Sequence, residues 1–166
     1  MGTDVALMRR AARTGETVLR VYGWSGPVLS LGRNQRARHA YREDELARQD
    51  IGVVRRPTGG RALLHHGEIT YSVTSPCPAG VALASEYRRI NNILIAALRE
   101  LGVKASVARP ACRMPAPDLA LCFAEPAAGE IVAAGRKLVG SAQWRDGGAL
   151  LQHGSILVDD DQSRLG

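Results

Sequence analysis

Short segments of β-branched and aliphatic residues, separated by glycine and proline, fill most of the chain and limit the folds open to it. Runs of this kind that are bounded by turn residues predict strands. The predicted strands span residues 18–22, 28–31, 52–56, 62–65, 69–74, 103–107, 130–133, 138–142 and 149–158. Most connections are as short as hairpins, which join antiparallel strands, whereas parallel strands need long crossovers. We therefore expect a mixed, mainly antiparallel sheet.

Three segments have helical patterns. Apolar residues recur at steps of three or four in 86–101, which predicts the longest helix. A second helix is predicted over 3–14, with Thr3 as its cap and Gly15 as its stop. A polar segment, 43–49, forms the third, while 109–118 is a proline-rich loop and 159–165 looks like the first turn of a further helix. The fold class is therefore α/β (α+β), a sheet packed with a few helices.

The length and composition are those of a globular domain. The 166 residues, 45% of them hydrophobic, predict a single domain over 1–166 whose core needs no disulfide. No run of 18 apolar residues is present, so we expect no membrane span. The three cysteines are irregularly spaced and no signal segment precedes the first helix, so we expect a reducing, cytoplasmic location.

The chain is basic. It carries 22 Lys and Arg against 16 Asp and Glu, a net charge of +6, and 20 of the 22 cations are Arg. A compositional bias of the source genome is one explanation, and a preference for acidic partners is a second. Nucleic acid, an acidic membrane surface and an acidic carrier protein all fit the charge. The 4% of aromatic residues leaves little for base stacking, which argues against nucleic acid.

Residues 55–61 read Arg-Arg-Pro-Thr-Gly-Gly-Arg, where a strand ends in a glycine pair flanked by three guanidinium groups. Such a loop suits an anion or a polarised carbonyl, although a tight turn with solvated arginines is the simpler alternative. His65 and His66 follow, but no second cluster stands at metal-ligand spacing, so we expect no metal site. Neighbouring residues of a strand face opposite ways, so only one of these histidines can face a site.

Cys122 follows the apolar triplet 119–121 and precedes Phe123. A free thiol with a pKa near 8.5 is only about 3% thiolate at pH 7. A reactive Cys122 would therefore need a nearby cation or base, and a small buried apolar side chain is the alternative. Nothing marks Cys77 or Cys112, which neighbour prolines, as chemical.

Segments 135–143 and 150–156 combine a rare lysine with glycines inside strand patterns. Lys137 is one of two lysines, and a compact ammonium can meet a carbonyl or phosphate oxygen closely. Gly140 and Gly154 weaken strand packing, and such glycines often mark the close approach of a ligand or another backbone. Two strands that line one pocket, or an ordinary glycine-bearing hairpin, would both explain the pattern.

Taken in order, these stretches resemble the lipoate-protein ligase A / octanoyltransferase family, which has the biotin/lipoate A/B protein ligase catalytic domain. The matching segments are 22–35, 55–65, 68–72, 135–143 and 151–156, so the resemblance covers residues 4 to 165. It implies the mixed, mainly antiparallel fold of that catalytic domain. Gly-Gly-Arg at 59–61, the pair Cys122-Phe123 and Gly-Ser-Ala-Gln at 140–143 are closest to the cysteine-dependent octanoyltransferase branch.

The resemblance also implies roles for particular residues. Cys122 would be the nucleophile, and Lys137 would face the acyl carbonyl. His153 would orient a partner or move a proton, or would be an inert sheet histidine. The substrate-binding residues would be Arg55, Arg56, Thr58, Gly59, Gly60, Arg61, His65, Gly140, Ser141, Ala142, His153 and Gly154. We expect Cys122, Lys137 and the Gly59-Gly60 loop to converge in one cleft.

The implied reaction moves an octanoyl or lipoyl group from acyl carrier protein, through an enzyme thioester, to a lysine of a lipoyl domain or of the glycine-cleavage H protein. It needs no ATP, metal or cofactor. The alternatives are an ATP- and magnesium-dependent lipoate-protein ligase, in which Cys122 is dispensable, and a truncated, non-catalytic carrier- or acyl-binding module. The chain departs from the family pattern at His66, where Asp is usual, and we expect it to lack the family's first strand and its part beyond Leu165.

Overall fold

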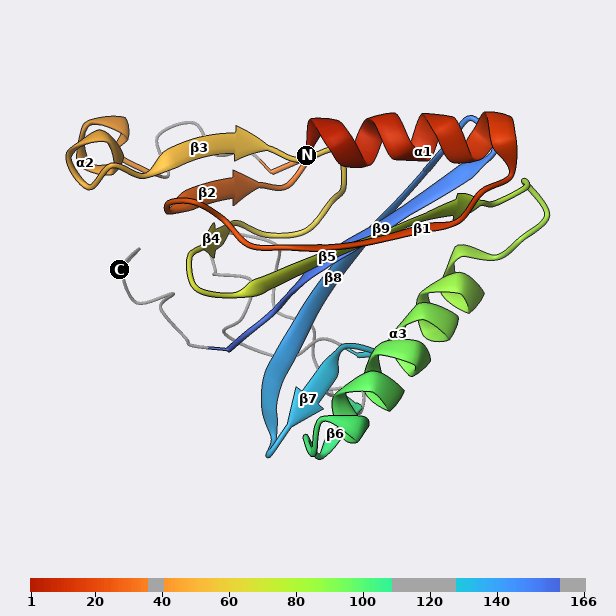
Figure 1. Cartoon of the computed structure of the whole chain (residues 1–166). Helices are drawn as coiled ribbons and strands as arrows, with labels where there is room; N and C mark the ends of the chain where they lie inside the picture. The colour runs from red at the N-terminus through yellow and green to blue at the C-terminus, as the bar shows by residue number, and fades with distance from the viewer. Residues whose placement is uncertain (36–40, 109–127, 159–166) are drawn as a thin grey trace.

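The computed structural model describes residues 1–35, 41–108 and 128–158. The helices are α1 (Gly2–Thr14), α2 (Glu43–Arg48) and α3 (Leu83–Glu100). The strands are β1 (Val18–Tyr22), β2 (Val28–Leu31), β3 (Gly52–Arg55), β4 (Leu63–His65), β5 (Ile69–Pro76), β6 (Ala105–Val107), β7 (Ile131–Ala133), β8 (Arg136–Asp146) and β9 (Ala149–Ile156). Figure 1 shows their arrangement.

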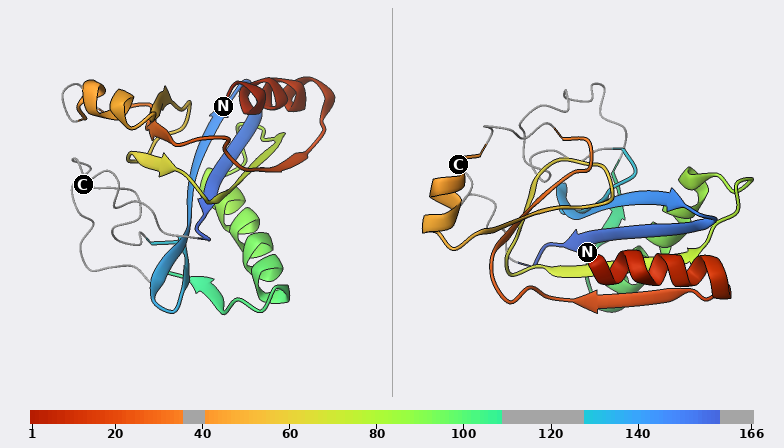
Figure 2. Two further views of the ribbon diagram at one scale, coloured as in Figure 1. Left: turned by 60° about the vertical axis from the view of Figure 1, so that its left-hand side comes forward. Right: turned by 90° about the horizontal axis from the view of Figure 1, so that it is seen from above.

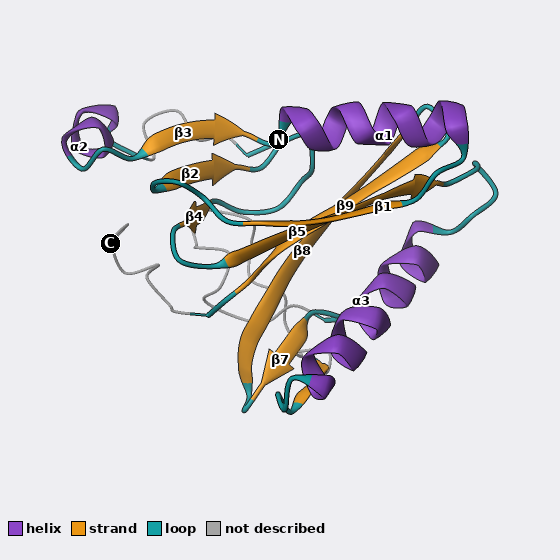
Figure 3. Cartoon of the chain, viewed as in Figure 1, coloured by secondary structure: helices purple, strands orange, loops and turns teal. Residues whose placement is uncertain are grey.

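The described strands form two sheets. The larger has the order β1-β5-β9-β8-β7-β6, and each neighbouring pair in it is antiparallel. The smaller has the order β3-β2-β4, with β2 parallel to β3 and antiparallel to β4. The parallel pair is joined by the segment that contains α2, as a parallel connection requires (Figure 3). The predicted mixed, mainly antiparallel sheet with a few helices is confirmed.

Helices α1 and α3 pack on opposite faces of the larger sheet (Figure 2). Because side chains alternate along a strand, Leu150 of β9 faces the core that includes Ile90 and Ile95 of α3. Its neighbour Leu151 faces the other side, where it packs with Met8 and Ala11 of α1. The expectation that the long helix lies across the sheet is therefore correct.

The start of α1 differs from the prediction. Met1, not Thr3, is the N-cap, and no side chain caps the helix, because the helix begins at Gly2 and the Val5 N–H bonds to the Met1 carbonyl. Thr3 is exposed inside the first turn. The end is as predicted: Gly15 adopts φ +76°, a left-handed conformation that glycine reaches without strain, and its N–H bonds to Ala11.

Strand β8 is longer than predicted. It runs over Arg136–Asp146 because its pairing with β9 continues up to Asp146 and Ala149, next to the turn at Gly147 and Gly148. The proline-rich loop 109–118, Cys112, Cys122 and the predicted helical turn at 159–165 lie outside the described residues. None of the described helices has both the length and the apolar character of a membrane span.

Candidate functional site

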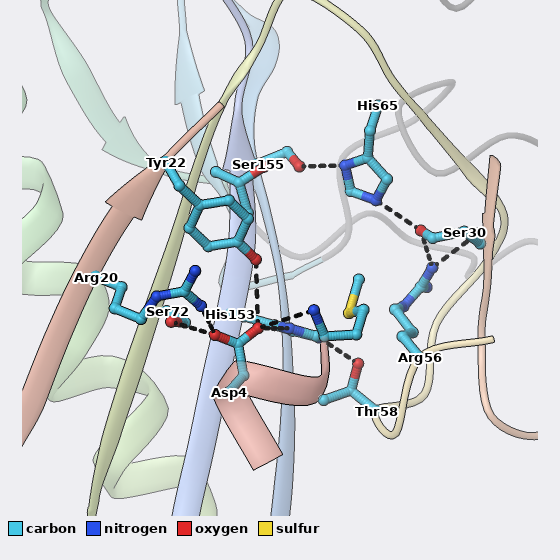
Figure 4. Close-up of polar contacts among 12 residues, drawn as sticks. Asp4, Arg20, Tyr22, Ser30, Arg56, Thr58, His65, Ser72, His153 and Ser155 are labelled. Atoms are coloured by element: carbon cyan, nitrogen blue, oxygen red, sulfur yellow. Dashed lines mark hydrogen bonds and ion pairs between the residues drawn. The ribbon is translucent and has the colours of Figure 1, made fainter. Parts of the chain in front are cut away.

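A buried polar layer lies on the α1 side of the larger sheet. The cross-strand pairs Arg20 with Ser72, Ser72 with His153, and Thr70 with Ser155 bring polar side chains of β1, β5 and β9 to one face (Figure 4). Buried polar groups need hydrogen-bond partners. Here those partners come from α1, from the smaller sheet and from the loop 56–62. This loop contains Gly59 and Gly60, is called the glycine loop below, and is held against β9.

The first set of contacts connects α1 to the glycine loop through His153. Thr58 Oγ1 lies 2.6 Å from His153 Nε2, and His153 Nδ1 lies 3.8 Å from Asp4 Oδ2. The carboxylate near Nδ1 favours the tautomer with its hydrogen on Nδ1, so Nε2 accepts the Thr58 hydroxyl hydrogen. All three residues are buried. The three side chains therefore join helix, sheet and loop in one chain of contacts.

Asp4 is the anion at one end of this chain of contacts. Ser72 Oγ donates to it at 2.8 Å, Tyr22 OH donates at 3.3 Å, and Arg20 pairs with it. Burial alone would raise the pKa of Asp4, but polar His153 and Ser72 together with the Arg20 charge outweigh it, and the pKa falls to about 2. Burial lowers the pKa of His153, so the imidazole is neutral at pH 7.

The second contact network runs through His65. Its Nδ1 lies 2.5 Å from Glu68 Oε1 and its Nε2 lies 2.7 Å from Ser30 Oγ, so the ring bridges β4 to β2. Thr70 and Ser155 also donate to Glu68 Oε1, at 3.1 and 3.3 Å. Although burial pushes the pKa of Glu68 up, the hydrogen bond and charge of His65 hold it below its usual value. His65 is buried and His66 exposed, so only one histidine of the pair faces this site, as predicted.

Trp24 packs against the His65 ring and bonds to Thr70 in this network. Its indole stacks on the His65 ring at a centroid distance of 4.2 Å, and Nε1 donates to Thr70 Oγ1 at 2.8 Å. The stacking fixes the plane of the imidazole, and the hydrogen bond fixes the indole in turn.

Arg56 ties the second network to the glycine loop. Its guanidinium donates to the Ser30 carbonyl and to Ser30 Oγ, both at 3.0 Å. It also donates to the carbonyls of Gly59 and Arg61, at 3.1 and 2.6 Å. A planar guanidinium with five donors suits this role. Arg56 is buried, and its described hydrogen bonds to the carbonyls of Gly59 and Arg61 fix the shape of the loop.

A glycine that sequence reasoning missed lets a second loop lie against the first. A Cβ on Gly32 would lie 1.9 Å from the Gly60 carbonyl oxygen, so only glycine fits there. The Arg33 N–H donates to the Thr58 carbonyl at 2.8 Å, and Arg55 donates to the carbonyls of Gly32 and Gln35. Gly59 is partly buried and Gly60 exposed, so the rim of the loop reaches the surface.

Lys137 is a buried cation in β8. Its Nζ lies 2.7 Å from Glu130 Oε1, and its side chain is 3% exposed. A buried charge needs such a partner. Cys122 lies outside the described residues, so the convergence of Cys122, Lys137 and the Gly59-Gly60 loop stays a prediction.

Gly154 and Gly140 are neighbours across β8 and β9. A Cβ on Gly154 would lie 2.3 Å from the Gly140 carbonyl oxygen, so this glycine permits the close approach of another backbone. Ser141 Oγ lies 2.7 Å from Tyr71 OH, and Gln152 donates to Tyr71 OH at 2.9 Å. Ala142 pairs with His153 across the two strands. Ala142 is therefore beside His153, whereas Ser141 meets Tyr71 on the opposite face of the sheet, which packs against α3.

Asp4, Ser30, Gly32 and Glu68 were not predicted as site residues. Ser30 and Gly32 contact the loop segment through Arg56 and Gly60, whereas Asp4 and Glu68 act through His153 and His65. The available signals were the family motifs, since Ser30 and Gly32 lie in the segment 22–35 and Glu68 lies in 68–72. Among residues 1–35, 41–108 and 128–158, no three His, Cys, Asp or Glu side chains form a group that could hold a metal ion.

Comparison with known proteins places this geometry in a family. The model of the lipoyl protein ligase A/B catalytic domain matches residues 1–166. The octanoyltransferase LipM of Kyrpidia tusciae is 46% identical over 174 residues, which cover 99% of this chain and 63% of that protein. The chain therefore spans somewhat less than two thirds of the length of this curated relative.

Solved structures of lipoate-protein ligases have the same fold. Lipoate-protein ligase A bound with ATP superposes with a TM-score of 0.79 at 26% identity, over 98% of this chain and 62% of that one. A bi-partite lipoate protein ligase from Thermoplasma acidophilum, studied with its E2 lipoyl domain, superposes with a TM-score of 0.76 at 26% identity, over 98% of this chain and 57% of that one.

Proposed function

The chain belongs to the lipoyl protein ligase A/B catalytic domain family, and from this premise we propose that it transfers an octanoyl group from acyl carrier protein to a lysine of a lipoyl domain or of the glycine-cleavage H protein. The observation that supports the proposal is that the chain has a higher sequence identity to an octanoyltransferase than to a lipoate-protein ligase. The chain is 46% identical to an octanoyltransferase and 26% identical to a lipoate-protein ligase bound with ATP.

The proposed reaction has two steps. The Cys122 thiolate attacks the carbonyl carbon of the donor thioester, and the bond from that carbon to the carrier's sulfur breaks, so the carrier leaves as a thiol after protonation. The neutral amine of the acceptor lysine then attacks the acyl-enzyme. The bond to Cys122 sulfur breaks, an amide forms, and the amine's proton goes to the departing thiolate.

Lys137 is the proposed stabiliser of the oxyanion that forms in each step. A buried ammonium is worth more to a developing negative charge than a solvated one, because the surroundings screen it less. Its ion pair with Glu130 would hold the ammonium in place before the substrate arrives. The N–H groups of the Gly59-Gly60 loop are further candidate donors, and the contacts of Arg56 and His153 give that loop a fixed shape.

The proposal includes no ATP, metal or cofactor, because a thioester is already activated for acyl transfer. It places the reaction in the cytoplasm. The lipoyl-domain acceptor is supported by the Thermoplasma acidophilum ligase, whose structure was analysed with its E2 lipoyl domain. A net charge of +6 supports an acidic carrier as donor.

Intact-mass measurement tests the proposal directly. Wild-type protein and the Cys122→Ser variant are mixed with octanoyl-acyl carrier protein in the absence of ATP. We expect the wild type to gain the mass of one octanoyl group, hydroxylamine to remove it, and the variant to gain nothing. The variant's serine keeps the size of the side chain, so the comparison isolates the thiol.

Two other results would overturn the proposal. Acylation of a lipoyl domain only when ATP, magnesium and free octanoate are added would identify the ATP-dependent ligase. Binding of the carrier without acylation under either condition would identify a carrier- or acyl-binding module.

A further inference from the structure

A small pocket lies between α1 and the β8–β9 hairpin, away from Lys137. Its volume is about 250 Å³, and its apolar lining includes Met8, Ala12 and Trp144. Arg9 and Arg13 line its rim on the helix side, and Asp146 lines it on the hairpin side. The pocket therefore combines an apolar, partly aromatic floor with a basic edge.

The two helix arginines have no ionic partner in the part of the chain that the structure describes. Both are exposed, and they stand four residues apart on one face of α1, where like charges repel each other. Their neighbour Arg10, by contrast, pairs with Glu16 at 2.7 Å. A third guanidinium, that of Arg33, lies over the Trp144 ring at 5.6 Å from its centroid.

Arg33 and β8 connect this basic pocket to the candidate site. Arg33 reaches Trp144 with its side chain and donates its backbone N–H to Thr58 of the glycine loop. Trp144 and Ala142 share one face of β8, and Ala142 pairs with His153. A partner seated on Arg9, Arg13 and Trp144 would therefore lie beside the loop.

We infer that the pocket of Arg9, Arg13, Arg33 and Trp144 is the docking surface for the acyl carrier protein that donates the octanoyl group. An acidic segment of the carrier would face the three arginines, and an apolar side chain of it would enter between Met8 and Trp144. Charge complementarity carries this assignment, since the pocket and the adjoining Arg33 together have three guanidinium groups against one carboxylate, that of Asp146. The inference rests on the proposed octanoyl transfer.

The distance along β8 favours the donor over the acceptor as occupant. Trp144 is seven residues from Lys137 on the same strand, which corresponds to roughly 23 Å. A lysine side chain has only a four-carbon stem and cannot bridge that distance from a docked acceptor domain. A carrier protein holds its acyl group on a long flexible arm, so it can dock at a distance from the reacting carbon.

A pair of double variants with equal changes of charge tests the inference. Arg9→Glu with Arg13→Glu alters the pocket, and Arg88→Glu with Lys104→Glu alters exposed positions in and beyond α3. The affinity of each for octanoyl-acyl carrier protein is measured by titration calorimetry, with Cys122→Ser added to prevent turnover. Steady-state transfer is measured in parallel with the carrier and with octanoyl-pantetheine, which has the thioester but not the carrier surface.

We expect the Arg9/Arg13 variant to bind the carrier at least tenfold more weakly, with a raised KM for the carrier and unchanged kinetics on octanoyl-pantetheine. The Arg88/Lys104 variant should stay within twofold of the wild type. Equal weakening by both variants would show a general charge effect, and selective loss of lipoyl-domain binding would assign the pocket to the acceptor; either overturns the inference. If the Arg9/Arg13 variant transfers the octanoyl group with an unchanged KM for the carrier, the docking surface alone is overturned. If that variant loses carrier binding but the wild type never transfers an octanoyl group, the proposed function alone is overturned.

Discussion

At the scale of single residues, the candidate site depends on charges that are buried together with a partner. Lys137 has Glu130 at 2.7 Å, and Asp4 has Arg20, Tyr22 and Ser72 around its carboxylate. Removing one member of such a pair leaves the other uncompensated, which costs more than the pair itself contributes. A role in the reaction must therefore be separated from a role in folding.

The Lys137→Met variant separates a role of Lys137 in the reaction from a role in folding. Methionine has a similar length but no charge, so we expect the rate of octanoyl transfer to fall by about 10²–10³, as when an oxyanion donor is removed. Lys104→Met, at an exposed position, is the control and should keep full activity. Thermal unfolding of both variants shows whether Lys137→Met is still folded, and a folded variant with wild-type turnover would contradict the role given to Lys137.

At the scale of elements, the glycine loop is held by two independent networks and by a second loop. His153 and Thr58 attach it to β9, whereas Arg56 attaches it to Ser30 of β2. Gly32 permits the contact between the two loops, since any Cβ there would overlap the Gly60 carbonyl. The loop is thus preorganised before any substrate binds, which is what stabilisation of a transition state requires.

Gly32→Ala tests the contact between the loops. We expect the free energy of unfolding to fall by about 1–3 kcal/mol, because the added methyl group overpacks a site that has no space for it. Urea denaturation measures the change. Gly23→Ala is the matched control, since a Cβ there meets nothing within 4 Å, and it should unfold like the wild type. Equal midpoints for the two variants would show that the loops do not need this close approach.

At the scale of the whole molecule, the buried carboxylate of Asp4 links α1 to the larger sheet. Asp4 contacts residues of β1 and β5 and lies near His153 of β9, so it connects the helix to three strands. The apolar side of the helix, with Met8 and Ala11, packs against the same sheet. Stability should therefore depend on the charge of Asp4.

Acid unfolding tests this dependence. The folded-state pKa of Asp4 is about 2, below its ordinary value of 3.8, so the carboxylate stabilises the fold above pH 4 and loses that contribution as the pH falls from about 4 to 2. The shift corresponds to roughly 2 kcal/mol. Asp4→Asn should be less stable than the wild type at pH 7 and should lose less stability over this interval, as followed by urea denaturation at each pH. Asp50→Asn, at an exposed position, should follow the wild-type curve.

Much of the fold was predictable because its signals are local. Alternating β-type residues and glycine turns marked the strands, the apolar period marked α3, and the left-handed Gly15 marked the end of α1. The predicted N-cap of α1 was wrong: Thr3 has a hydroxyl that can cap a helix, but the helix is capped two residues earlier, at Met1. The order of the motifs indicates the family from the sequence alone, and the match of the family model to residues 1–166 confirms it.

The partners of the glycine loop were not predictable in this way. Asp4 lies near His153, and His153 bonds to Thr58, 95 residues away along the chain. Such contacts depend on strand order, with β5 between β1 and β9, and on register, since a shift of one residue would turn every side chain to the opposite face. Local patterns establish which residues form strands and which motifs they carry. Long-range pairing alone establishes which polar side chains meet, because burial brings them together only once the sheets have packed.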